Sequence, residues 1–160
     1  MKKGQEIKSM LKQINHDVKF KKDYIVDLNS LDVSQNDRNV YPDLHYAGGQ
    51  GYYQMNDNSL NHLCNRLEIG TRYISKCLPV SQELINHNVN FWINKNKNKK
   101  LMLRTIEGHD INRVRAIMSD RYKRIDSDVV ANSTLEKLMD MNAELKYSYY
   151  DGDSMNITAV

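Results

Sequence analysis

The chain has 160 residues, the size of one domain that can bury a core of its own. Hydrophobic residues make up 40% of it and charged residues 27%, which indicates a globular protein and argues against collagen-like and disordered classes. The net charge of +3 is mild. It permits nucleic-acid binding through a local patch and argues against a histone-like protein or a highly charged virion tail.

Targeting and redox signals are sparse. The N-terminal stretch has no apolar run of the kind that a secretory signal needs, and no segment approaches the roughly 20 apolar residues of a membrane span. Cys64 and Cys77 lie in apolar helical patterns without C-x-x-C spacing, so we expect reduced core residues in an intracellular protein. The chain stops within a strand-like run at residues 156–160, which favours the N-terminal part of a longer product.

The first third of the chain predicts a helix, a strand and a loop. Apolar residues recur at helical spacing in residues 5–18, which indicates an amphipathic helix or arm within residues 1–20. Alternation then predicts a strand at 23–29. Residues 34–51 are rich in Asn, Asp and Gly, which is typical of a loop. The glycines at 48, 49 and 51 lack the G-K-[ST] ending of a phosphate loop, so we expect a turn before a short strand at 52–55.

A helical block follows at residues 57–93. Asn56 or Asp57 caps its first helix, and Gly70 is expected to end that helix. Thr71 opens a short second helix. Ser81 caps the third, whose apolar face is expected to combine the residues Leu84, Ile85, Val89 and Trp92.

The last third predicts two hairpins around a helix. Strands at 101–107 and 113–119 are joined by a turn at residues 108–110, a helix covers roughly 128–142, and Asp151–Gly152 joins strands near 145–149 and 155–160. The helix is expected to present an apolar face that includes Val130, Met139 and Met141. The whole predicts a single α+β domain of residues 1–160, with an antiparallel sheet and a segregated helical block.

The first of these hairpins carries the candidate site. Six cations and one aromatic residue gather on it and beyond it: Arg104, Arg113, Arg115, Arg121, Tyr122, Lys123 and Arg124. At period two, Arg113, Arg115 and Ile117 share one face of their strand. Cations on a rigid element with aromatic rings that stack on bases favour single-stranded nucleic acid, with Tyr122, Tyr52 or Tyr53 as the stacking ring. The alternative is a structural corner in which the arginines pair with Asp120, Asp126 and Asp128.

Catalytic and metal signals are weak. Glu107, His109 and Asp110 cluster at a turn, but a metal ion would need a further ligand from elsewhere. The chain shows no nucleophile elbow, no Cys–His pairing and no Walker motif. We therefore expect no enzyme, no metal and no cofactor.

One family resemblance sharpens the hypothesis. LRT-x-E-G at residues 103–108 and VRA-x-x-SDRY-x-x-ID at 114–126 resemble a phage/plasmid-like protein family of unknown function, and residues 53–69 are similar to the strand-then-helix segment of that family. The resemblance covers about residues 50–130, although Gly70–Thr71 stand where the family tends to carry a proline.

The resemblance implies a protein of a bacteriophage or plasmid, with a longer family fold. It implies a location in the cytoplasm of a bacterial host or in the virion. With the basic hairpin, it favours binding of single-stranded or deformed DNA without base specificity, in replication or in recombination and annealing. The alternative is a virion-associated structural protein that acts through protein–protein contacts. The partners expected are nucleic acid or other phage proteins, and further copies of the chain as a homo-oligomer, with no membrane.

Overall fold

The structure is a computed structural model that describes residues 6–49, 51–96, 98–108, 111–152 and 154–160. Contacts divide the chain into two compact units. Unit 2 is the continuous segment 22–122, and unit 1 combines residues 1–21 with 123–160. Unit 2 is thus an insertion between the two parts of unit 1. The expectation that the chain is a single folding domain stays a prediction.

Unit 2 contains a six-stranded sheet in the order β1-β5-β6-β4-β3-β2. Its strands, of which β1 begins at the junction between the units, are β1 (Lys21–Asp27), β2 (Leu31–Ser34), β3 (Asp43–Tyr46), β4 (Tyr52–Gln54), β5 (Lys100–Ile106) and β6 (Arg113–Ser119), and a short 3-10 turn η1 (Leu28–Ser30) links the first two. β4 and β6 run parallel, whereas β2–β3, β3–β4 and β5–β6 are antiparallel. The basic hairpin predicted from the sequence is therefore β5–β6, which lies inside the sheet between β1 and β4.

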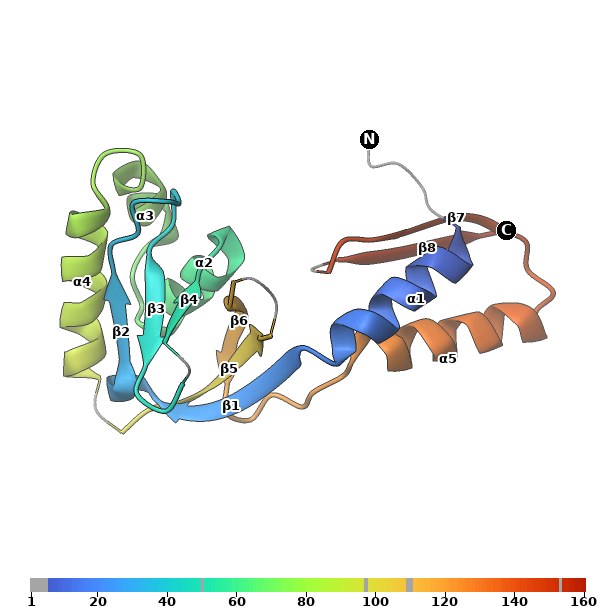
Figure 1. The fold of residues 1–160 in the computed structure, drawn as a ribbon, viewed down its shortest axis with the longest axis horizontal. Helices are drawn as coiled ribbons and strands as arrows, with labels where there is room; N and C mark the ends of the chain where they lie inside the picture. The colour runs from blue at the N-terminus through green and yellow to red at the C-terminus, as the bar shows by residue number, and fades with distance from the viewer. Residues whose placement is uncertain (1–5, 50, 97, 109–110, 153) are drawn as a thin grey trace. The chain divides into compact units, whose positions relative to one another are not determined.

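Unit 2 also contains the helices α2 (Asp57–Arg66), α3 (Thr71–Cys77) and α4 (Gln82–Lys95), of which α3 packs on the other two (Figure 1). α2 packs against β6, and α4 packs against β2. Buried side chains of the helices and the strands form one hydrophobic core, which includes Cys64 and Cys77. Both cysteines are buried free thiols, as expected. The α+β class with a mostly antiparallel sheet and a segregated helical block is confirmed.

The expected loop at 34–51 is wrong in part, because β3 lies inside it. A strand of four residues with one fully buried side chain, Leu44, gives too short an alternation to detect, and pairing with β2 and β4 stabilises it. The glycine-rich turn after β3 is confirmed. A Cβ at Gly48 would lie 2.5 Å from the Tyr46 hydroxyl, and one at Gly49 would lie 2.6 Å from the Tyr46 ring. Glycine lets the backbone turn closely over that ring.

Two expectations about the helical block are also wrong. Asn56 caps α2 through a capping box, but Gly70 does not end this helix. Glu68 takes the left-handed conformation at φ 61°, and the Ile69 amide donates to the Cys64 carbonyl at 2.9 Å, so Gly70 instead precedes α3 as its N-cap. In α4, the buried residues are Ile85, Val89 and Ile93, which recur every four residues. Leu84 and Trp92, expected in that face, are 43% and 45% exposed.

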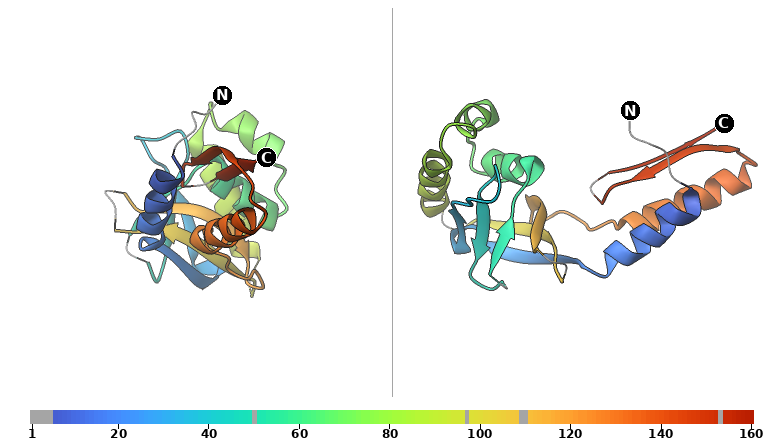
Figure 2. Two further views of the ribbon diagram at one scale, coloured as in Figure 1. Left: turned by 90° about the vertical axis from the view of Figure 1, so that its right-hand side faces the viewer. Right: turned by 45° about the horizontal axis from the view of Figure 1, so that its top comes forward.

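Unit 1 contains two helices and a hairpin. These elements are α1 (Ile7–Val18), α5 (Ser127–Asp140), β7 (Leu145–Tyr150) and β8 (Met155–Ala159). The hairpin runs along the helices, and β7 packs against α1 (Figure 2). Met10, Ile14, Ala131 and Tyr150 form its core. The expected apolar face of α5 is wrong at Val130, Met139 and Met141, which are all exposed. No described helix is both long and apolar enough to cross a membrane.

Candidate nucleic-acid interface

A bulge in β6 decides where its arginines lie. Arg104 pairs with Ala116, but Thr105 pairs with Val114, so Arg115 is the extra residue. Val114 and Ile117 are both buried in the core that the helices cover. The face expected from strict alternation, with Ile117 beside the arginines, is therefore wrong. Arg113 and Arg115 share the opposite face of β6, since an extra residue shifts the alternation by one position.

Arg104 lies on that face but is not available to a ligand. It is 8% exposed, and its Nε donates to Asp23 Oδ1 of β1 at 3.2 Å. Its guanidinium lies 5.5 Å from the centre of the Tyr122 ring, within the range of a cation–π contact. Two predicted site residues, Arg104 and Tyr122, thus meet in an internal cluster. A phosphate could reach Arg104 only by displacing Asp23.

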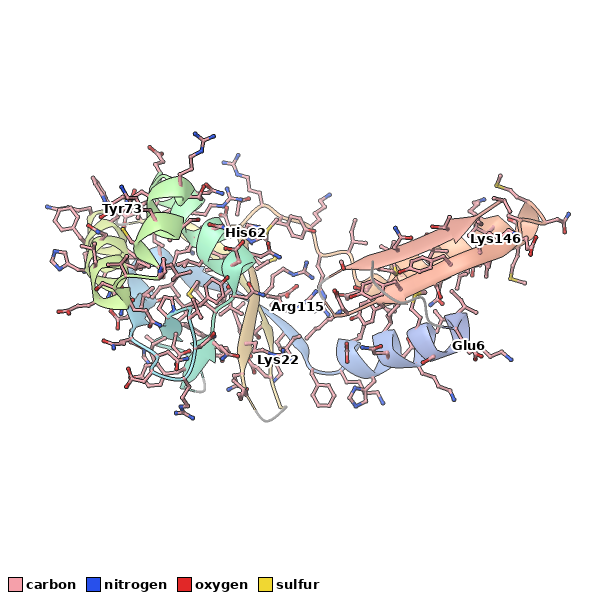
Figure 3. All side chains as sticks on the ribbon, turned by 90° about the horizontal axis from the view of Figure 1, so that it is seen from above. Glu6, Lys22, His62, Tyr73, Arg115 and Lys146 are labelled. Atoms are coloured by element: carbon pink, nitrogen blue, oxygen red, sulfur yellow. The ribbon has the colours of Figure 1, made fainter. Side chains whose placement is uncertain are left out.

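The other predicted cations differ in exposure. Arg113 and Arg121 are exposed, and no ion pair with another described residue is recorded for either side chain. Arg113 is the first residue of β6 and Arg121 follows its last residue by two positions, and the six residue steps of the strand span about 20 Å. Arg115 is half-buried in the bulge, where Figure 3 labels it. Lys123 and Arg124 belong to unit 1. Lys123 is exposed, whereas Arg124 Nε contacts Asp126 Oδ1 at 2.6 Å, as the structural alternative expects for that residue.

A polar cleft lies beside Arg113 and was not predicted from the sequence. It has a volume of about 370 Å³ and is lined by Asn36, Arg38, Asp43, Tyr52, Gln54, Ile111 and Asn112. Gln54 of β4 is paired with Arg113 of β6, and the backbone N–H of Gln54 donates to the backbone carbonyl of Asn112 at 2.9 Å. The cleft therefore adjoins the exposed end of the central strand. Of its residues, Tyr52 alone was a candidate from the sequence.

The loop that forms one wall of the cleft is held from α4. Gln82 Oε1 accepts from the backbone N–H of Asn36 at 3.0 Å, and Gln82 Nε2 donates to the backbone carbonyl of Asn39 at 2.6 Å. Asn36 Nδ2 donates to Asp43 Oδ1 at 2.8 Å, and the Arg38 amide donates to Asn36 Oδ1 at 2.8 Å. Hydrogen bonds therefore fix the position of this wall of the cleft.

The two tyrosines of β4 have opposite roles. The Tyr52 side chain is 61% exposed, and its ring lies 5.4 Å from the ring of His45. Tyr53 is fully buried, and its hydroxyl donates to Glu107 Oε1 at 2.9 Å. Tyr52 is therefore available to stack on a base, and Tyr53 is not. No signal other than strand alternation distinguishes them in the sequence.

Glu107 is a buried carboxylate with four donors. Tyr53 and Thr105 donate to its Oε1, and Lys22 and Tyr24 donate to its Oε2, at distances of 2.9–3.1 Å. Lys22, labelled in Figure 3, extends from β1. Burial by itself raises the pKa of Glu107, but the four hydrogen bonds outweigh this and hold the pKa below its ordinary value. Burial of Tyr24 and its hydrogen bond to the Glu107 carboxylate raise the pKa of Tyr24. Glu107 thus links β1, β4 and β5 through these hydrogen bonds.

The hypothetical metal site at Glu107, His109 and Asp110 lies partly outside the described residues, since 109 and 110 are not described. Within the described ranges, no group of three or more His, Cys, Asp or Glu side chains is placed to hold a metal ion. Comparisons with protein-family models, curated proteins and solved structures return no match to this chain. The resemblance to a phage/plasmid-like family stays a prediction.

Proposed function

We propose that this protein binds single-stranded or deformed DNA through unit 2, in replication or recombination of a phage or plasmid. The observation that carries the proposal is the exposed Arg113 on the central strand, beside a cleft with Arg38 and the exposed Tyr52. Cations on a paired strand cost little conformational entropy to position. A nearby tyrosine ring supplies the base stacking that binding of single strands needs.

Compared with the sequence expectation, the proposed interface loses Arg104 and gains Arg38. Arg113 and Arg121 of unit 2 provide contacts to phosphates. Tyr52 replaces Tyr122 as the stacking ring, because Tyr122 already lies against Arg104. Each phosphate neutralised releases counterions, so the affinity falls with salt at a slope of about −0.7 per contact on single strands.

The test is fluorescence anisotropy with a labelled oligonucleotide of about 15 nucleotides. We expect the wild type to bind at low salt and the R38E/R113E double variant to lose most of that affinity. Arg115 is left unchanged because a glutamate in its half-buried bulge would perturb the sheet. The matched control is Arg72→Glu, a charge reversal at an exposed position of α3. Absence of wild-type binding at low salt, or equal loss in the R72E variant, would refute the proposal.

A second candidate function, self-assembly as a structural protein, is favoured by the edge of β8. Among the described residues β8 pairs with β7 alone. Val160 and Glu144 exchange both backbone hydrogen bonds, at 3.0 and 2.8 Å. In the alternating pattern of antiparallel strands, the amides of Met155, Ile157 and Ala159 then point away from β7.

No charged side chain lies in residues 155–160, and charges are a common means of protecting such an edge. Addition of the β8 strand of a second copy would extend this hairpin. Light scattering with and without nuclease separates the two candidates. An oligomer that survives nuclease, in a protein that binds no oligonucleotide, would favour the structural role.

A further inference from the structure

The cleft beside Arg113 contains side chains that its own hydrogen bonds do not use. Within the described part of the chain, no hydrogen bond of the Gln54 side-chain amide, the Arg38 guanidinium or the Tyr52 hydroxyl is recorded. Asp43 Oδ1 accepts from Asn36, and Oδ2 of the same carboxylate has no recorded partner. A flat ring, a cation, an amide and a carboxylate therefore line one hollow of about 370 Å³.

The pairing across strands places three of these groups side by side. Asp43 lies opposite Gln54, and His45 lies opposite Tyr52, in the antiparallel pair β3–β4. Side chains of directly paired residues share a face with Cβ atoms about 5 Å apart. Tyr53 between them is buried, so Tyr52 and Gln54 point to the opposite face. The carboxylate and the amide thus lie next to each other, with the tyrosine one step along the same face.

This set of groups is unsuited to a phosphate alone and suited to a nucleobase. A carboxylate repels phosphate but accepts hydrogen bonds from ring N–H and amino groups. Among the common bases, guanine alone presents two adjacent donors on its Watson–Crick edge, N1–H and the 2-amino group. Single-stranded nucleic acid is generally read in this way, with an unstacked base placed on an aromatic ring and its edge hydrogen-bonded.

We propose that the cleft binds one unstacked guanine of the bound strand, with Asp43 accepting from its Watson–Crick edge, Tyr52 stacking on the ring and Arg38 at the adjacent phosphate. Gln54 donates to the guanine O6. The inference rests on the proposed binding of single strands and adds a base preference that contacts to phosphates alone cannot give.

The test compares labelled oligothymidylate of about 15 nucleotides with the same strand carrying one central guanine or one central hypoxanthine. Hypoxanthine lacks only the 2-amino group. We expect the wild type to prefer the guanine strand by about tenfold, since one bidentate base contact gives discrimination of that order. The hypoxanthine strand should lose much of this preference. Preservation of guanine preference in the Asp43→Asn variant would overturn the role of Asp43.

Asp43→Asn is the informative variant because its amide oxygen can still accept from Asn36. Because the variant no longer repels phosphate, we expect it to bind oligothymidylate at least as tightly as the wild type and to lose the guanine preference. Tyr52→Thr keeps a residue that favours β-strands at an exposed position. It should lower the affinity for all three oligonucleotides about tenfold, because the stacking ring is lost. Circular dichroism checks that both variants remain folded.

The outcomes separate this inference from the proposed function. Equal wild-type affinity for the three strands overturns the guanine site and leaves strand binding intact. No binding of any strand, together with no binding of guanosine monophosphate, overturns both proposals. A further arm measures direct binding of guanosine monophosphate by titration calorimetry. Tight binding of the free nucleotide, with no binding of strands, would support the guanine cleft and overturn the proposed function.

Discussion

Replacing Glu107 by alanine should strongly destabilise unit 2. The carboxylate is 3% exposed and accepts from four donors, two of which, the hydroxyls of Tyr53 and Thr105, belong to fully buried residues. Removing the carboxylate takes away the acceptor of the Tyr53 hydroxyl, whereas Thr105 Oγ1 can still donate to the Lys22 carbonyl at 3.4 Å. Leaving one buried group unsatisfied costs about 1–3 kcal/mol and weakening a second hydrogen bond about 1 kcal/mol, so the free energy of unfolding should fall by about 2–4 kcal/mol. Lys22, whose side chain is half exposed, adds little because it can turn to water.

Urea denaturation followed by circular dichroism measures this change. Glu107→Gln should cost less, about 1–2 kcal/mol, because one acceptor oxygen remains and hydroxyl groups can rotate. The matched control is Glu136→Ala at an exposed position of α5, which should stay within about 0.5 kcal/mol of the wild type. A Glu107→Ala variant as stable as this control would show that the network does not hold the strands together.

The same carboxylate gives a pH dependence with a definite sign. Because the folded protein holds the pKa of Glu107 below its ordinary value, the unfolded chain binds the proton more tightly. The stabilisation is complete above the unfolded pKa of about 4.3 and is lost as the pH falls through the lower folded pKa. The Glu107→Gln variant should lose this part of the acid sensitivity. An unchanged acid profile in that variant would refute the assignment.

Three further predictions address other regions. Burial raises the pKa of the Cys64 thiol to about 12, so this thiol should react with Ellman's reagent at pH 8 only after denaturant is added; fast reaction of the native protein would contradict its burial. Removing the two cations in the R38E/R113E variant should lower the salt slope of oligonucleotide binding by about 1.4, measured by anisotropy between low and moderate salt, and an unchanged slope would show that they contact no phosphate. Ala159→Pro should leave the monomer folded and abolish any oligomer seen by light scattering, since it removes an amide that points away from β7; an oligomer that persists would place the contact elsewhere.

Periodicity and turn chemistry predicted most of unit 2 and the hairpin of unit 1. The Asp151–Gly152 turn, the cap at Asn56 and the β5–β6 pair all follow from local patterns, and the structure confirms them. β3 does not follow, because its short strand depends on neighbours that are distant in sequence. The face of β6 was predicted wrongly beyond Arg115, because nothing in VRA-x-x-S marks a bulge, whereas a glycine would have indicated one.

The candidate site was predicted in part, for a similar reason. Local charge density located the cations, but it could not reveal that Arg104 meets Asp23, a residue 81 positions away. Local charge density also could not indicate that Arg38 and Asp43, from the expected loop, line the same cleft as Gln54. Exposure separated Tyr52 from Tyr53, and strand alternation alone could not have said which of the two faced the core.

Arg104 has a consequence for the order of folding. It contacts Asp23 and Tyr122, which stand next to the two ends of the inserted segment, so a folded unit 2 brings its own ends to one side chain. In an unstructured chain, closing a loop of about 100 residues costs on the order of 4 kcal/mol of entropy, by the logarithmic dependence on loop length. Early formation of the sheet in unit 2 removes that entropy cost from the folding of unit 1, whose helices and hairpin come from residues 1–21 and 123–160. Folding of unit 1 is therefore expected to follow formation of the Arg104 contacts with Asp23 and Tyr122.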